Sequence, residues 1–193
     1  MTEMVLRELD DAQLEALYAS HMQHDFPQNE LKRLSRLYEL KRRGLYRTTA
    51  LYAGEKLCAY AMFSGAPDCP CLLLDYFAVD PALRGKGIGT QALQVITDWA
   101  KDQAQGILIE AENPDFARTL NERRTRIRRM NFYRHCGAKL TGYRLWLYFV
   151  DYCVFYLAVD SVSRTDAYLQ KAQAQIYRAQ FTQQVYDTRV RFY

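Results

Sequence analysis

Apolar residues recur along the chain with two periods, and together they predict an alternation of strands and helices. Runs that alternate with polar residues, or that are continuously apolar over the length of a strand, indicate β-strands. Such runs cover residues 5–9, 48–53, 57–64, 71–79, 107–112, 139–147 and 149–159. The run at 71–79 is almost unbroken, which is typical of a strand covered on both faces.

Apolar residues at helical spacing fill the segments between these strands. The predicted helices contain Leu14 to Tyr18, Leu31 to Leu40, Ile88 to about Gln105, Phe116 to Met130, and Ala167 to Phe181. Asp10 or Asp11 is expected to cap the first helix and Asn29 the second, which Gly44 ends. Strand, helix and strand over residues 71–112 predict a βαβ unit, in which the two strands are parallel neighbours.

A turn rich in glycine connects the first strand of this unit to its helix. Asp80-Pro81 stops the strand, because proline lacks an N–H donor and biases its neighbour away from the helical region. Gly85, Gly87 and Gly89 then lead into the helix. Glycines at a helix start leave backbone N–H groups uncovered at the positive end of the helix dipole. Such a position favours a phosphate or pyrophosphate.

The spacing of these glycines excludes two nucleotide-binding classes. A nucleoside-triphosphate loop requires Gly-x4-Gly-Lys-Ser/Thr, and a dinucleotide fingerprint requires a glycine where Thr90 stands. What remains is Arg84-x-x-Gly87-x-Gly89, after a strand that ends in Ala78-Val79. In this setting the sequence resembles the GNAT N-acetyltransferase family, whose pyrophosphate-binding motif is Arg/Gln-x-x-Gly-x-Gly/Ala.

The resemblance implies a fold and its extent. The implied fold class is α/β (α+β), an acyl-CoA N-acyltransferase fold with a mixed central sheet of about seven strands flanked by helices. The order of the predicted elements is the one expected of that family over residues 4–160. We therefore expect a GNAT acetyltransferase domain at 1–160 and a C-terminal helical extension at 161–193. The apolar stripe of the extension is expected to pack on the domain or on a partner subunit, as in a homodimer.

By the same resemblance the co-substrate is acetyl-CoA. The family separates its two central strands, here 71–79 and 107–112, and the pantetheine arm lies between them. Backbone groups of residues 77–79 are then expected to bond the pantetheine, and one N–H to polarise the thioester carbonyl. The implied cofactor-binding residues are Phe77, Ala78, Val79, Arg84, Gly85, Lys86, Gly87, Ile88, Gly89 and Thr90.

Tyr133 is the candidate general acid. The family often has a Tyr-x-x-x-Gly-Phe pattern, and this chain has Tyr133-Arg-His-Cys-Gly137-Ala138, with Ala138 in place of the phenylalanine. A phenol, with a reference pKa of about 10, is suited to protonating a departing thiolate. The simpler alternative is that Tyr133 only packs at the end of its helix.

Several groups are candidates for the general base. Glu110 and Glu112 share one face of the second central strand, and Asp75 lies in the first. A carboxylate in an apolar strand is costly to bury unpaired, so its presence indicates water, a partner or a cationic substrate. The alternatives are Glu110, Glu112, Asp75 and a water chain. One of the glutamates could instead pair with the neighbouring arginines.

Other reactive side chains receive no catalytic role. His135 lies near a helix end, where the dipole alone favours a protonated imidazole. Cys136 lacks the histidine context of a thiol nucleophile. His21 and His24 have no partner spacing. The pair in Cys69-Pro-Cys71 lacks a second pair or histidines at metal spacing, so no metal is expected.

The composition indicates the class of protein and its cellular compartment. The 193 residues, 49% hydrophobic and 25% charged, suit an ordinary soluble domain. Five cysteines, an odd number, predict free thiols in the cytoplasm. No apolar run reaches the length of a membrane span, and residues 1–4 do not begin a signal peptide.

The net charge of +4 is mild, although seven arginines lie between residues 118 and 134. They accompany no nucleic-acid recognition motif, so a solvated helix face is the preferred interpretation.

Together these features predict an N-acetyltransferase that moves an acetyl group from acetyl-CoA to a primary amine, by direct attack in a ternary complex. The acceptor is an amine of a small molecule or of a protein, and its identity cannot be read from the pattern. A non-catalytic acyl-CoA-binding or sensing module is the alternative from another class, and an arginine-rich nucleic-acid binder is the third. Tyr133, Glu110 and Glu112 argue for catalysis.

Overall fold

The computed structural model describes residues 3–160 and 162–193. In this part of the chain an open mixed sheet of eight strands has the order β1-β2-β3-β4-β5-β7-β6-β8. The strands are β1 (Met4–Glu8), β2 (Tyr46–Ala53), β3 (Lys56–Ser64), β4 (Cys71–Val79), β5 (Gly106–Glu112), β6 (Lys139–Leu147), β7 (Val150–Ala158) and β8 (Val190–Phe192). Of these neighbours only β4 and β5 are parallel, as the βαβ pattern predicts. The α/β fold class is confirmed.

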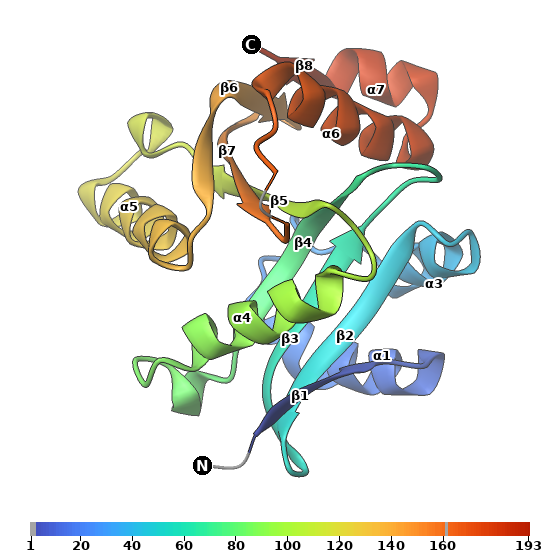
Figure 1. Ribbon diagram of the computed structural model, residues 1–193, viewed down its shortest axis with the longest axis vertical. Coiled ribbons are helices and arrows are strands. Elements are labelled where there is room, and N and C mark those ends of the chain that lie inside the picture. The colour runs from blue at the N-terminus through green and yellow to red at the C-terminus, as the bar shows by residue number, and fades with distance from the viewer. Residues whose placement is uncertain (1–2, 161) are drawn as a thin grey trace.

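Helices cover both faces of this sheet (Figure 1). They are α1 (Asp11–Leu17), α2 (Gln23–Asp25), α3 (Leu34–Arg42), α4 (Ile88–Ala100), α5 (Leu120–His135), α6 (Asp166–Gln180) and α7 (Gln183–Arg189), and a π-helical turn at Tyr18–Met22 joins α1 to α2. None of the helices in the described ranges has the length and apolar composition needed to cross a bilayer.

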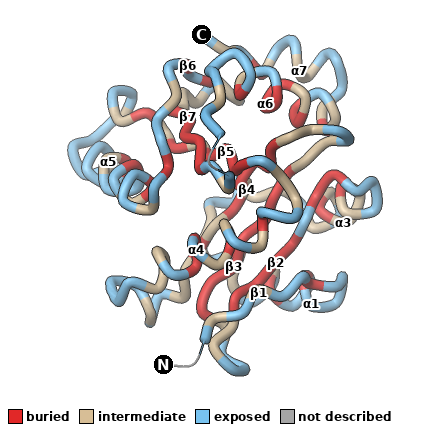
Figure 2. Tube along the Cα trace, in the orientation of Figure 1, coloured by how far each residue is buried: buried red, intermediate tan, exposed pale blue. Residues whose placement is uncertain are grey.

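The side chains of β4 show which helices share a face. Leu72 and Leu74 belong to the cluster that contains the buried residues of α4 and α5. Leu73 points to the opposite face, into the cluster formed with α6, and Tyr76 joins the cluster formed with α1 and α3. The sheet therefore lies between an α4–α5 layer and an α1–α3–α6 layer, and Figure 2 shows the buried residues concentrated along its central strands.

The two parallel strands pair over only part of their length. Register pairs run from Cys71↔Gly106 to Leu74↔Ile109 and then stop, although β4 stays paired with β3 up to Val79. A register shift between Met62 and Phe63 of β3 leaves Asp75 without a partner at this point. Bulges increase local twist, which helps to turn the end of β4 away from β5. We call this opening between residues 75–79 and 110–112 the fork.

Several local signals act as predicted. Asp10 accepts a hydrogen bond from the N–H of Gln13 at 2.8 Å, and the Gln13 side chain accepts one from the N–H of Asp10, which makes a capping box. Gly44, at φ +68°, follows α3 in the left-handed conformation that commonly ends helices.

The predicted helix cap at Asn29 is wrong, because α3 begins only at Leu34. Residues 27–33 lie instead along β4. The hydroxyl of Tyr76 accepts a hydrogen bond from the N–H of Lys32 at 2.9 Å and donates one to the carbonyl of Glu30 at 2.8 Å. These tertiary bonds replace the helical bonds that the apolar spacing predicts.

The predicted stripe of α5 is also wrong at its beginning. Phe116 and Leu120 are exposed, and the buried residues of the helix are Arg126, Met130 and Tyr133. A buried arginine breaks the apolar period, so the predicted stripe is right at Met130 and wrong in the first turns of the helix.

The single final helix of the prediction is two helices and a strand. α6 ends where Phe181 turns extended, α7 follows with Thr182 as its cap, and β8 pairs antiparallel with residues 145–147 of β6. Ser161, where the predicted extension starts, and residues 1–2 of the predicted domain lie outside the described residues. The division of the chain at residue 160, and a homodimer, stay predictions.

Candidate active site

The glycine-rich turn forms an open start for α4. Gly85 and Gly87 have φ of +75° and +79°, a region that other residues enter only with strain. No atom outside their immediate chain neighbours lies within 4 Å of a Cβ placed on either of them. Gly87 occupies the N-cap position, and no side chain accepts from the first N–H groups of the helix. This helix end therefore has unused donors and open space in front of them.

The side chains of Arg84 and Lys86 form hydrogen bonds that stabilise this turn. The Arg84 guanidinium donates to the carbonyl of Val79 at 3.0 Å and pairs with the Asp25 carboxylate at 3.1 Å. Lys86 donates to the carbonyl of Ala82 at 3.0 Å. Arg84 thus ties the turn to the end of β4 and to α2, Lys86 closes the turn on itself, and both side chains are exposed.

The turn also meets the end of α5. A Cβ on Gly89 would come within 3.2 Å of the Phe132 ring, and the hydroxyl of Thr90 lies 3.8 Å from the Cys136 sulfur. The ring of Phe132 also stacks on that of Phe77, with centroids 6.2 Å apart. The predicted cofactor-binding residues therefore form one continuous region from the fork to the start of α4.

This region fits coenzyme A in its chemistry. Along residues 75–79 the edge of β4 that faces β5 has no partner strand, so its backbone groups are available to amides of the pantetheine kind. The open N-terminus of α4 offers N–H groups and a positive dipole end to a pyrophosphate.

Glu110 is the first residue of β5 beyond the segment that pairs with β4. Its carboxylate accepts hydrogen bonds from the Gln173 amide at 2.5 Å and from the Tyr177 hydroxyl, both in α6. Burial raises the pKa of the Glu110 carboxyl to about 7, although these two hydrogen bonds oppose the rise, and the charge of Asp75 adds to it. A carboxyl with this pKa exchanges its proton near neutral pH.

Asp75 is the corresponding residue of β4. Its carboxylate accepts two hydrogen bonds from the Lys32 ammonium, at 2.7 and 2.8 Å, and one from the Tyr46 hydroxyl. Burial and the charge of Asp75 keep the pKa of the Tyr46 phenol well above its usual value. The fork therefore has a carboxylate on each of its two strands, one paired with a cation and one hydrogen-bonded to neutral groups.

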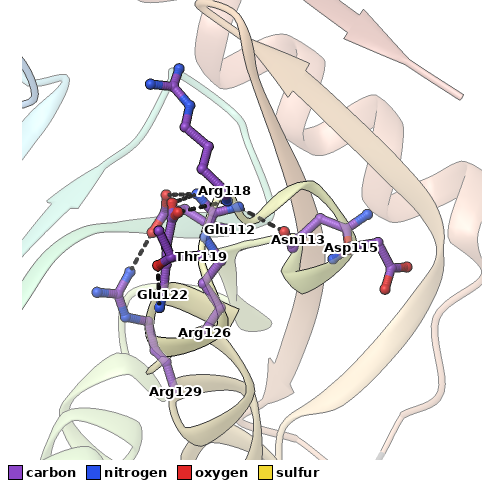
Figure 3. A network of polar contacts seen from close by, with 8 residues as sticks. All are labelled: Glu112, Asn113, Asp115, Arg118, Thr119, Glu122, Arg126 and Arg129. Atoms are coloured by element: carbon purple, nitrogen blue, oxygen red, sulfur yellow. Dashed lines mark hydrogen bonds and ion pairs between the residues drawn. The ribbon is translucent and has the colours of Figure 1, made fainter. Parts of the chain in front are cut away.

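Glu112 is engaged by arginines of α5. Arg126 and Arg129 converge on its carboxylate at 2.8 and 3.3 Å (Figure 3). Arg126 also donates to the carbonyl of Asn113 at 2.8 Å and is buried, so it depends on these acceptors. This is the pairing with neighbouring arginines that the sequence left as an alternative, and it ties β5 to α5.

Tyr133 lies buried in the α4–α5 layer, with its ring 6.2 Å from that of Phe155 and 5.3 Å from that of Phe132. Within the described chain no hydrogen bond engages its hydroxyl. Burial raises the pKa of the phenol to about 12, against a smaller opposing effect of Arg129. The side chain is therefore protonated throughout the neutral range.

Sequence reasoning missed the contribution of α6. Gln173 is fully buried and also accepts a hydrogen bond from the Tyr143 hydroxyl at 2.8 Å. The signal available in the sequence was a glutamine and a tyrosine, four residues apart, on the same side as the apolar stripe of the last helix. Residues at this spacing point the same way.

Cys136 lies beside Thr90, but its thiol is not set up as a nucleophile. Burial raises the pKa of the Cys136 thiol, which disfavours the reactive thiolate. Among the described residues, no three His, Cys, Asp or Glu side chains are grouped so that they could hold a metal ion.

Comparison with known proteins agrees with this geometry. The acetyltransferase (GNAT) family matches residues 6–138. The chain belongs to this family and is an N-acetyltransferase. A comparison with curated proteins finds no match.

Solved structures share the fold at low sequence identity. A GNAT-family acetyltransferase from Bacteroides thetaiotaomicron, described as putative, is 18% identical with a TM-score of 0.62, and the match covers 87% of this chain and 93% of that one. The ribosomal-protein-S18-alanine N-acetyltransferase of Escherichia coli is 17% identical with a TM-score of 0.57, over 83% and 97% of the two chains. A spermidine N-acetyltransferase SpeG chimera from Vibrio cholerae and hSSAT is 14% identical with a TM-score of 0.59, over 86% and 98%.

Proposed function

We propose that this protein transfers an acetyl group from acetyl-CoA to a primary amine by direct attack in a ternary complex, in the cytoplasm. The observation that carries this proposal is the fork. There β4 offers an unpaired edge between the open start of α4 and the carboxylate of Glu110. Solved relatives named for a ribosomal-protein alanine and for spermidine support an amine as acceptor, of either a protein or a small molecule.

Each group of the candidate site has a proposed task. The N–H groups of residues 85–90 bind the pyrophosphate, and backbone groups of residues 77–79 bind the pantetheine. Bound acetyl-CoA supplies the acetyl thioester. Glu110 accepts the proton of the acceptor amine, because its pKa of about 7 lets it be ionised at neutral pH and still take up a proton. Tyr133 donates the proton of its phenol to the departing thiolate of coenzyme A.

Glu110 is preferred as the base over the other carboxylates. Glu112 is held by Arg126 and Arg129, and Asp75 is held by Lys32. The oxygens of both carboxylates are therefore occupied by cations, whereas Glu110 has no ion-pair partner among the described residues.

The test is release of free thiol from acetyl-CoA with a panel of primary amines, repeated with Tyr133→Phe. We expect amine-dependent thiol release by the unchanged protein, and about 100-fold slower release by the variant, which lacks the proton donor. The ring of Tyr133 is retained, so folding should be retained too. Equal turnover by the variant would remove Tyr133 from the mechanism, and no turnover with any amine would contradict the proposed function.

A further inference from the structure

A lysine side chain is bound to Asp75, the first residue of the fork on β4. The Lys32 ammonium donates to both oxygens of Asp75, at 2.8 and 2.7 Å, and lies 5.3 Å from the centroid of the Tyr76 ring. The side chains of Lys32 and Asp75 are only 26% and 16% exposed. A carboxylate, a phenol and an aromatic face around an ammonium are the groups that recognise organic cations elsewhere in proteins.

This group of side chains lies at the beginning of the fork, where the acceptor amine is expected to bind. Asp75 directly follows Leu74, the last residue of β4 that pairs with β5, and Glu110 directly follows Ile109, its partner. Asp75 and Glu110 therefore lie next to each other in the two strands where the fork begins, and Lys32 is bound to Asp75. An amine bound by Asp75 therefore lies beside the proposed base.

The segment that carries Lys32 is fastened by a small number of bonds. Residues 27–33 contain no helix or strand of the fold. The Tyr76 hydroxyl bonds the backbone of Glu30 and Lys32, and the Tyr18 hydroxyl donates to the carbonyl of Lys32 at 3.1 Å. Segments with few buried apolar contacts open at low free energy. Lys32 can therefore leave the fork without unfolding of the sheet.

We propose that Asp75, with Tyr46 and the ring of Tyr76, is the subsite for the ammonium group of the acceptor, and that Lys32 is an internal occupant which the acceptor displaces. The acceptor class is a primary alkylamine, because the occupant is itself an ammonium on an unbranched aliphatic chain. This inference deepens the proposed function and rests on it. It also makes Lys32 a competitor that lowers the apparent affinity for the acceptor.

The first experiment compares Lys32→Gln with Lys41→Gln, using n-butylamine as acceptor and thiol release as the readout. Lys41 makes a comparable contact with Asp11, at 2.7 Å, but ties α3 to the start of α1 and not to the fork. Removing the competitor should lower the KM for n-butylamine about fivefold in Lys32→Gln, the effect expected of one partly exposed ion pair. Lys41→Gln should leave that KM unchanged. An equal or higher KM in Lys32→Gln overturns the proposal.

The second experiment measures binding without turnover. The melting temperature of Lys32→Gln should rise as n-butylammonium chloride is added, and should not rise with n-butanol. The double variant Lys32→Gln/Asp75→Asn should show neither rise. Lys32→Met, which keeps the aliphatic chain, is the second form should Lys32→Gln fail to fold.

The two hypotheses can fail separately. Absence of thiol release with every amine, together with the Asp75-dependent thermal shift, contradicts the proposed function and retains the subsite. No thermal shift in either Lys32 variant, or an equal shift in the double variant, overturns the subsite.

Discussion

Glu110 and Glu112 lie two residues apart on the same face of β5, yet their carboxylates have different partners. Glu112 faces two guanidinium groups of α5, and both form ion pairs with it. Glu110 faces an amide and a phenol of α6 and no direct cation, so burial dominates and its pKa rises to about 7. The pair therefore offers a matched comparison between a proposed base and a structural carboxylate.

We expect Glu110→Gln to lower kcat/KM for amine acetylation by about 100- to 10,000-fold, the usual contribution of a general base. In the unchanged protein kcat/KM should rise as pH increases through about 7, because the carboxyl must be ionised to accept a proton. That rise should be absent in the variant. The Tyr133 phenol, with a pKa of about 12, adds no alkaline decline below about pH 10. Steady-state rates between pH 5.5 and 9 measure both effects.

Glu112→Gln is the control for this prediction. It removes a charge that Arg126 depends on, so it should cost about 1–3 kcal/mol of unfolding free energy and leave the rate of the folded protein nearly unchanged. A larger rate loss in Glu112→Gln than in Glu110→Gln would exchange the two assignments.

At the scale of elements, the turn before α4 is the part whose conformation is set most locally. Gly85 and Gly87 both adopt positive φ, and the helix starts directly after them. The Arg84-x-x-Gly87-x-Gly89 spacing therefore predicted the turn and the helix start from sequence alone, because turn chemistry and a helix start need few distant contacts; its assignment to coenzyme A stays a prediction. The fork, by contrast, depends on a register shift between β3 and β4 that has no signal in the apolar run of β4.

Gly87→Ala and Gly54→Ala form a matched pair. Gly54, in the β2–β3 turn, has φ +63° and equally open space around a Cβ. Each substitution should cost about 1 kcal/mol through the left-handed backbone alone. Only Gly87→Ala should also weaken coenzyme A binding, by about tenfold or more, because its methyl group intrudes on the donors of α4. Thermal melting and calorimetric titration with coenzyme A give the two numbers, and equal coenzyme A affinities would argue against a pyrophosphate at this turn.

At the scale of the whole molecule, the C-terminal segment contacts the candidate site. The end of α6 is held by Arg43, which donates to the carbonyl of Ala179 at 2.7 Å, and by Arg36, which donates to that of Gln180. Positive side chains there complement the helix dipole. With its end fixed on α3, α6 presents Gln173 and Tyr177 to Glu110, more than sixty residues away in sequence.

We expect Tyr177→Phe to raise the pKa of Glu110, because the lost hydroxyl stabilises the ionised carboxylate. The rise of kcat/KM with pH should move upward by about half to one pH unit, the equivalent of one hydrogen bond. Tyr156→Phe removes a hydroxyl that donates to the carbonyl of Gln105 at 2.9 Å and should leave the profile in place. The same displacement in both variants would show a general effect of instability.

The sequence by itself determined the order of the elements as far as α6, the parallel pair in the centre and the glycine turn. Each of these depends on periodicity, on proline and glycine stereochemistry, or on helix-end donors, which act within a few residues. The tertiary structure alone decided that Glu112 pairs with arginines and that α6 reaches Glu110. It also decided that residues 27–33 lie on β4 with Lys32 at Asp75. These contacts join segments between 14 and 67 residues apart, and no local period encodes which of several carboxylates a distant cation or hydroxyl will meet.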